Sequence, residues 1–146
     1  MIDAANLVSK CSDEYNLVLM GLPLHDEYMD SIDNEKIIYV GYIDWIGHLF
    51  KYADLAVLTD DGVSIGEAIA SEIPIITLTK VKWGRYQNMA GVYEGAIIES
   101  EVEDVCKSID EVFKNYDSLK ENALIYADKC LSAGDDLVDD ILKKLE

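Results

Sequence analysis

Short apolar runs alternate with stretches of helical spacing along most of the chain, and this alternation restricts the fold more than any other feature. The runs are rich in Val, Ile and Leu, as expected of strands buried on both faces of a parallel sheet. They predict strands at residues 16–21, 36–42, 55–60, 74–79 and 96–100. Strands that alternate with helices indicate βα units, so the sequence predicts an α/β fold.

Helical spacing fills the intervals between the strands and the whole carboxy-terminal third. The predicted helices lie at residues 3–11, 46–53, 64–71, about 86–93, 101–116, 118–131 and 135–145, with a break at Ala133 and Gly134. No linker or repeat divides the chain. We therefore expect residues 1–146 to form a single domain, with a Rossmann-like parallel sheet of about five strands flanked by helices and a helical carboxy-terminal tail.

The charge and the cysteines restrict the function classes. A formal net charge of −17 disfavours nucleic acid and anionic lipid as partners. No apolar run approaches the roughly 18 residues of a membrane span, so no transmembrane segment is expected. Cys11, Cys106 and Cys130 lie far apart, without CxxC pairs or neighbouring histidines. They predict neither a disulfide framework nor a zinc site, and they favour a reduced, cytoplasmic location.

The segment "LTDDGVS" at residues 58–64 joins a predicted strand to a predicted helix. Ligands bind beyond the carboxyl ends of strands in such sheets, and the first amides of a helix attract anions. Gly62 lets a phosphate approach the backbone, and the hydroxyl of Ser64 adds a donor. This segment is therefore a candidate phosphate site.

Acidic residues around this segment have alternative interpretations. Glu67 either closes a capping box with Ser64 or accepts hydrogen bonds from ribose hydroxyls. Asp60 and Asp61 are suitable oxygen ligands for magnesium or calcium, but turn and helix-cap roles explain such aspartates more often. We therefore predict no metal site and no cofactor.

A second donor-rich segment, "KVKWGRYQN", follows the strand predicted at residues 74–79. Arg85 can bind phosphate oxygens in a bidentate manner, and Gln87 and Asn88 can donate amide hydrogen bonds at a helix start. Lys80 and Lys82 add charge. A solvated loop that offsets the acidic surface is the alternative. Two donor-rich helix starts after neighbouring strands nevertheless indicate a ligand with a polyanionic centre.

A catalytic group is not assigned by the sequence. No Ser-His-Asp, Cys-His or paired-carboxylate set stands out. His48 is expected on a helix face, and His25 lies in a loop without a partner that would orient it. Trp45 is expected to pack rather than to stack on a base.

The order "YADLAVLTDDGVSIGEAIASEIPIITLT", followed by "RYQNMAGVYEGAIIES", resembles the carboxy-terminal donor-binding domain of the GT-B glycosyltransferases. The group of the lipid-linked N-acetylglucosaminyltransferase of peptidoglycan synthesis is the most similar. The resemblance covers about residues 39–100. It implies half of a GT-B fold that binds a nucleotide sugar, usually a UDP-sugar, for hexosyl transfer to an acceptor.

The resemblance also implies roles for individual residues. Ser64 and the amides of Ile65 and Gly66 would meet the diphosphate of the donor, and Glu67 would hold the ribose hydroxyls. The remaining positions would contact the base and the sugar or diphosphate: the backbone of Tyr42 and Ile43 would edge the base, and Gln87 and Asn88 would approach the sugar or diphosphate.

A domain of this family normally opens with a strand and a glycine-rich loop, which would precede Met1. The resemblance therefore implies that the fold is completed by an amino-terminal acceptor domain or by a partner chain, with a homo-oligomer as a further possibility. Two alternative functions remain open at this point. One is a domain like that of a nucleotide-sugar 2-epimerase, and the other is a non-catalytic partner domain of a split glycosyltransferase.

Overall fold

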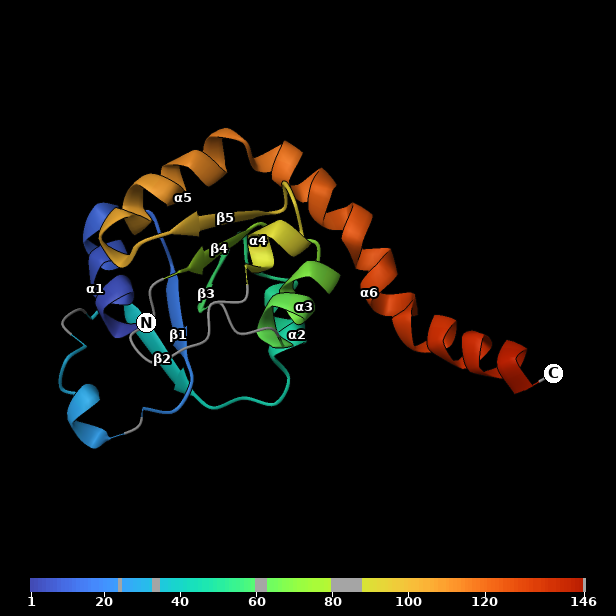
Figure 1. Ribbon diagram of the computed structural model, residues 1–146. Helices are drawn as coiled ribbons and strands as arrows, with labels where there is room; N and C mark the ends of the chain where they lie inside the picture. The colour runs from blue at the N-terminus through green and yellow to red at the C-terminus, as the bar shows by residue number, and fades with distance from the viewer. Residues whose placement is uncertain (24, 33–34, 60–62, 80–87, 146) are drawn as a thin grey trace.

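The computed structural model describes residues 1–23, 25–32, 35–59, 63–79 and 88–145. Its elements, in chain order, are α1 (Ile2–Cys11), β1 (Leu17–Met20), η1 (Asp26–Tyr28), β2 (Ile37–Gly41), α2 (Ile46–Phe50), β3 (Ala56–Thr59), α3 (Val63–Ala70), β4 (Ile75–Leu78), α4 (Met89–Val92), β5 (Ile97–Ser100), η2 (Val102–Asp104), α5 (Val105–Lys114) and α6 (Tyr116–Leu145). All the predicted strands are present, which confirms the α/β fold (Figure 1).

The described strands pair in parallel but form two separate ladders. β1 pairs with β2, while β3, β4 and β5 follow one another in a second sheet. Within the described residues no ladder joins β1 to β3. The boundary between the two ladders is called the seam below.

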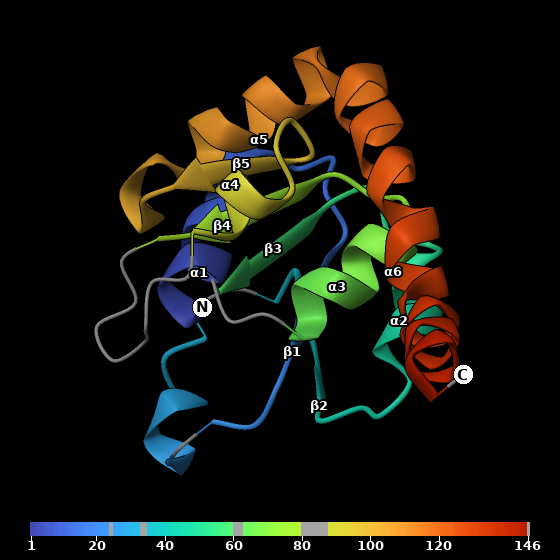
Figure 2. The same ribbon diagram turned by 45° about the vertical axis from the view of Figure 1, so that its right-hand side comes forward.

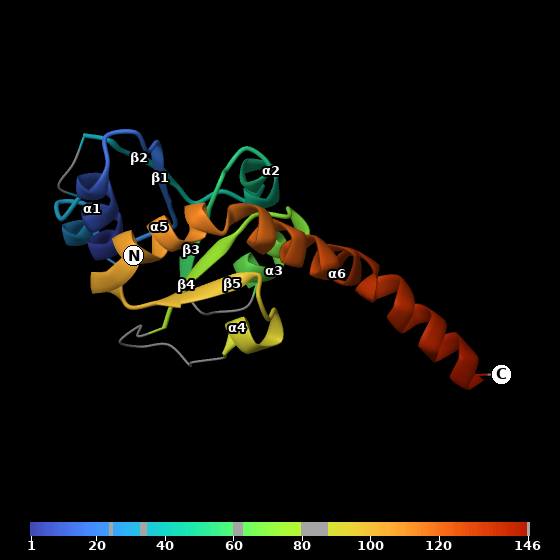
Figure 3. The ribbon, with the colours of Figure 1, turned by 90° about the horizontal axis from the view of Figure 1, so that it is seen from above.

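Helices cover both sides of the strands. Figures 1 and 3 show α1 to the left of the strands and α2 and α3 to the right, and Figure 2 shows α3 lying between β3 and α6. Every residue of β4 is buried because both of its faces are covered. Ile75 packs with α2, α3 and α6, whereas Ile76 and Leu78 pack with α1 and α5. The apolar run of β4 thus follows from its central position.

One face of the β1–β2 ladder is buried, and within the described residues the other is mostly exposed, although Met20 of β1 packs against the cluster of α2 and α3. Leu19 and Ile37 are buried against Ala5 of α1. On the opposite face Val18 and its register partner Ile38 are exposed, as is Val40. The expectation that these strands are buried on both faces is therefore wrong for this pair. Their apolar side chains favour a strand on both faces, but among the described residues mainly one face is buried.

The carboxy-terminal tail departs from prediction. The expected break at Ala133 and Gly134 is wrong, because α6 continues as one helix from Tyr116 to Leu145. One glycine inside a helix costs only about 1 kcal/mol relative to alanine, and Ala133 is a strong helix former. The first half of α6 is held by buried Ala123 and Ala127, and the second half projects away from the strands (Figures 1 and 3).

The cysteines also depart from prediction. Cys11, the last residue of α1, and Cys106, in α5, form a disulfide with a Cα–Cα distance of 6.1 Å. This separation lies within the usual range of about 4.4–6.8 Å. Cys130 is a free cysteine next to the hydroxyl of Tyr93. The expectation of no disulfide is wrong because tertiary packing of α1 on α5 unites residues that are 95 positions apart.

Candidate functional site

The candidate residues follow the carboxyl ends of β2, β3 and β4, as the parallel topology requires. Several of them lie outside the described residues: Gly62, Arg85 and Gln87, together with Asp60, Asp61, Lys80 and Lys82. Their predicted roles stay predictions. The described candidates are Tyr42, Ile43, Ser64, Ile65, Gly66, Glu67 and Asn88.

The first turn of α3 follows the end of β3 and is anchored in the hydrophobic core by the side chain of Ile65. Ile65 is 0% exposed and packs in the cluster that also contains Ile69 and Ile75. The backbone amides of Val63, Ser64 and Ile65 lie in the first turn of the helix, so they have no carbonyl acceptor within it. The burial of Ile65 therefore holds these amides at the strand ends, where the helix dipole favours an anion.

Ser64 lies inside α3, as its second residue. The capping-box interpretation is therefore wrong, because a helix cap must precede the first helical residue. Ser64 is half-buried and Glu67 is exposed. A Cβ added at Gly66 would meet open space. Within the described residues no hydrogen bond or ion pair occupies the carboxylate of Glu67, so its ribose-binding role stays a prediction.

The loop after β2 carries the residues proposed to edge a base. Gly41 ends the strand with φ +70° and its carbonyl accepts from the amide of Gly21 at 3.0 Å. This left-handed conformation turns the chain outward, and Tyr42 is 70% exposed while Ile43 is half-buried. The loop leads into α2, which packs against α3. The β2 loop and the first turn of α3 therefore belong to elements that share one hydrophobic cluster.

Asn88 has a structural role that the sequence reasoning missed. It caps α4 in a left-handed conformation (φ 49°, ψ 49°), and its side-chain oxygen accepts from the amide of Gly91 at 3.3 Å. A Cβ at Gly91 would come within 2.7 Å of the Asn88 amide nitrogen. The spacing of Asn and Gly in "NMAG" was the available signal. The capping oxygen is occupied, so any donor contact by Asn88 would use another part of the residue.

Thr77 was also missed by the sequence reasoning. It is fully buried near the carboxyl end of β4, and its hydroxyl has no hydrogen-bond partner among the described residues. A threonine inside the apolar run "IITL" was the available signal. A buried hydroxyl without a partner costs about 1–3 kcal/mol, so within the described residues Thr77 is an unfavourable choice for this core position.

Among the described residues, the two histidines and Trp45 do not form a catalytic arrangement. His48 is exposed on α2, as predicted, and Trp45 is about half exposed before the same helix. The ring of His25 lies 6.2 Å from that of Tyr28. Burial raises the pKa of Tyr93, with a further contribution from Cys130. In the part of the chain that the structure describes, no group of three His, Cys, Asp or Glu residues is placed to hold a metal ion.

Comparisons with known proteins find a similar sequence in a glucosyltransferase and a similar fold in a UDP-bound structure. No protein-family model matches the chain. A processive diacylglycerol beta-glucosyltransferase from Bacillus subtilis (strain 168) is 25% identical over 122 residues, which cover 81% of this chain and 32% of that protein. The crystal structure of Anabaena Alr3699/HepE in complex with UDP matches with a TM-score of 0.68 and 15% identity, over 97% of this chain and 44% of that one.

The class that these findings define is an α/β domain equivalent to half of a GT-B fold. The chain spans about a third of the length of the glucosyltransferase and less than half of the HepE chain. The finer resemblance to the peptidoglycan N-acetylglucosaminyltransferase group stays a prediction. No helix among the described residues combines the length and apolar character needed to cross a membrane.

Proposed function

We propose that this chain is the nucleotide-sugar-binding half of a GT-B glycosyltransferase, and that it binds a UDP-sugar for transfer of a hexosyl group. The observation that carries the proposal is the first turn of α3, which buried Ile65 holds beyond the end of β3 in a fold that matches a UDP-bound structure. The glucosyltransferase name of the B. subtilis relative supports a hexosyl donor.

The described residues suit the chemistry of donor binding. Amides at the start of α3 and the hydroxyl of Ser64 would bind the diphosphate, and they would stabilise the negative charge that develops on it as the sugar leaves. Glu67 would accept from ribose hydroxyls. Gly62, Arg85 and Gln87 would add the contacts predicted from the sequence.

The reaction needs a second half. The relatives are two to three times longer than the matched region, and the strands divide at a seam. Unpaired strand edges recruit another strand readily, and β1 and β3 each pair on one side only within the described residues. These edges favour completion by another segment or chain, so a partner domain of a split glycosyltransferase is the second candidate.

Isothermal titration of the chain with UDP tests the proposal, with folding verified by circular dichroism. Glu67→Ala removes the ribose acceptor and should weaken UDP binding about tenfold or more, since a hydrogen bond to a charged group contributes roughly 1.5–3 kcal/mol. Glu72→Ala is the matched control, because it removes the same group from an exposed position beyond the far end of α3. UDP should still bind this control normally.

Two results would contradict the proposal. One is the absence of UDP binding to the folded wild-type chain. The other is an equal loss of affinity in Glu67→Ala and Glu72→Ala, which would mean that a general change in charge, rather than a ribose contact, controls binding.

A further inference from the structure

We propose that Cys11 and Cys106 form a reversible redox clamp across the seam, and that its oxidation state controls how firmly the two ladders are held together. A second consequence, a change in affinity for the nucleotide, rests on the function proposed above. The clamp itself rests on the positions of α1 and α5 and does not depend on that function.

α1 is anchored to the β1–β2 ladder. Ala5 packs with Leu19 and Ile37 in a cluster of their own. The side-chain amide of Asn6 donates to the carbonyl of Ser31, which lies in the segment between η1 and β2, at 2.7 Å. Residues beyond the end of α1 add to this attachment.

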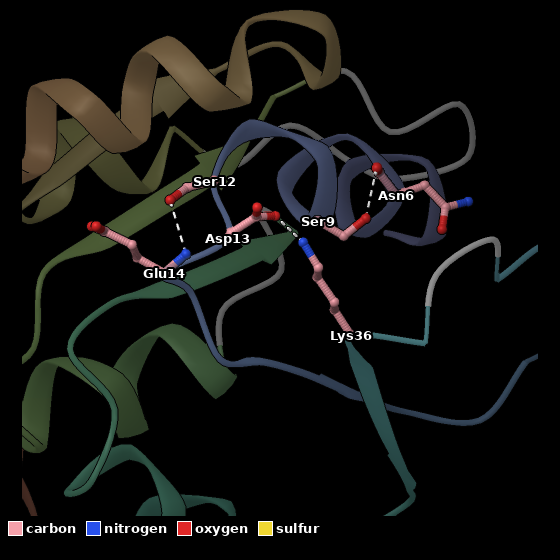
Figure 4. Close-up of polar contacts among 6 residues, drawn as sticks. All are labelled: Asn6, Ser9, Ser12, Asp13, Glu14 and Lys36. Atoms are coloured by element: carbon pink, nitrogen blue, oxygen red, sulfur yellow. Dashed lines mark hydrogen bonds and ion pairs between the residues drawn. The ribbon is translucent and has the colours of Figure 1, made fainter.

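The turn that follows α1 is ordered by polar contacts (Figure 4). Lys36, immediately before β2, forms an ion pair with Asp13. The hydroxyl of Ser12 accepts from the amide of Glu14 at 3.1 Å. Cys11 therefore sits at the end of a helix whose flanking turn is tied to β2.

α5 is anchored to the other ladder. The hydroxyl of Ser108 donates to that of Ser100, the last residue of β5, at 2.8 Å. Val105 and Ile109 are buried in the same cluster as Ile76 and Leu78 of β4. Cys106 lies between these two buried residues and moves with the β3–β4–β5 ladder.

Apolar packing and a covalent bond both cross the seam between α1 and α5. The first is apolar packing of Ala4 and Val8 on the α5 side chains. The second is the covalent bond between Cys11 and Cys106. Because no described strand ladder crosses the seam, this bond is a covalent tie between two bodies that otherwise share side-chain packing.

The redox step balances with a disulfide such as oxidised glutathione as the oxidant. The thiolate of one cysteine attacks the glutathione disulfide, which forms a mixed disulfide and releases one glutathione thiolate. The second cysteine thiolate then displaces the other glutathione, and both leaving thiolates take up protons. Two electrons pass from the protein thiols to glutathione. Cys11 is exposed, so small thiols and disulfides can reach it.

The clamp bears on the candidate site because the site spans the seam. Tyr42 and Ile43 follow β2 on one side, whereas Ser64 and Glu67 follow β3 on the other. A ligand that contacts both groups binds best when their spacing is fixed. Opening the disulfide would leave this spacing to side-chain packing and to the backbone that connects β2 to β3 through α2.

Peptide mapping and hydrogen exchange test the clamp directly. The wild-type chain is equilibrated with oxidised glutathione or with dithiothreitol, alkylated and mapped without further reduction. Oxidation should give a Cys11–Cys106 cross-linked peptide, and reduction should speed amide exchange in α1 about tenfold. Cys11→Ser and Cys106→Ser should exchange fast in both conditions. Cys130→Ser, which leaves the pair intact, should respond like the wild type.

Two results of this experiment would overturn the clamp. One is free, alkylated Cys11 and Cys106 after oxidation, or a cross-link to Cys130 instead. The other is a cross-link that forms without any change in the amide hydrogen exchange of α1, because packing alone would then hold α1 in place.

UDP titration of the oxidised and reduced chains tests the regulatory consequence. We expect about tenfold weaker binding on reduction, and no redox response in Cys11→Ser. Equal affinities in the two states overturn the regulation. If UDP binds in neither state, the proposed function fails and the regulation fails with it, while mapping and exchange still decide the clamp.

Discussion

Glu72 occupies a backbone position that is normally reserved for glycine. It follows α3 with φ 60°, and its amide donates to the carbonyl of Ile69 at 2.9 Å. The next amide, of Ile73, points back to the carbonyl of Ala68 at 3.5 Å. This pair of bonds defines a Schellman ending, in which the residue at the position of Glu72 adopts the left-handed conformation. Glu72→Gly should therefore stabilise the chain.

The size of the gain follows from two opposing terms. A residue with a Cβ costs roughly 1–2 kcal/mol in the left-handed region. Substitution by glycine removes this cost, but part of the gain is lost because glycine loses more backbone entropy on folding, by about 0.5–1 kcal/mol. The net gain is therefore roughly 0.5–1 kcal/mol. For a chain of this size, each 1 kcal/mol raises Tm by about 2–4 °C.

Urea and thermal unfolding of Glu72→Gly and Glu72→Ala measure this gain. Both variants remove one of the 29 acidic residues, so any relief of charge repulsion is common to them. Only glycine relieves the backbone. The free energy of unfolding of the glycine variant should exceed that of the alanine variant by roughly 0.5–1 kcal/mol. Equal or lower stability of the glycine variant would refute the assignment of strain to Glu72.

Substitutions at three other positions test separate features by urea unfolding. Asn88→Ala should cost about 2 kcal/mol, since it removes the α4 cap and puts alanine at a left-handed position that asparagine tolerates better, while Asn88→Gly should cost only a few tenths. Gly41→Ala should cost about 1–2 kcal/mol, because φ is +70°. Lys36 holds the pKa of Asp13 below its ordinary value. The stability that Asp13 adds over Asp13→Asn should therefore be present at pH 7 and disappear as the pH falls below about 3.9.

The strands could be predicted because their signal is local. The run around Ile75 is apolar at nearly every position, which a strand buried on both faces requires and a surface helix does not. Helix endings were harder to predict. Gly134 is a common helix terminator, yet α6 passes through it because one unfavourable residue is outweighed by its neighbours.

The candidate site could be predicted only as a set of loops. That Ser64 and Tyr42 follow strand ends is a consequence of parallel topology, and the sequence contains that information. Whether Asn88 binds a ligand or caps α4 depends on a backbone angle, which the sequence does not state. The pairing of Cys11 with Cys106 depends on how α1 packs on α5, so residue spacing carried no signal for it.

Local sequence pattern and tertiary structure disagree in the β1–β2 pair and in β3, which flank the seam. Ile38 and Val40 are apolar and β-branched, yet they are 55% and 41% exposed on the uncovered face of β2. Val57 and Leu58 of β3 are only half-buried, whereas every residue of β4 is buried. An apolar strand face gains about 25 cal/mol for each Å² that is covered, so these positions would gain stability from a covering partner. The side chains of β2 and β3 thus support the proposal that another segment or chain completes this half of the fold.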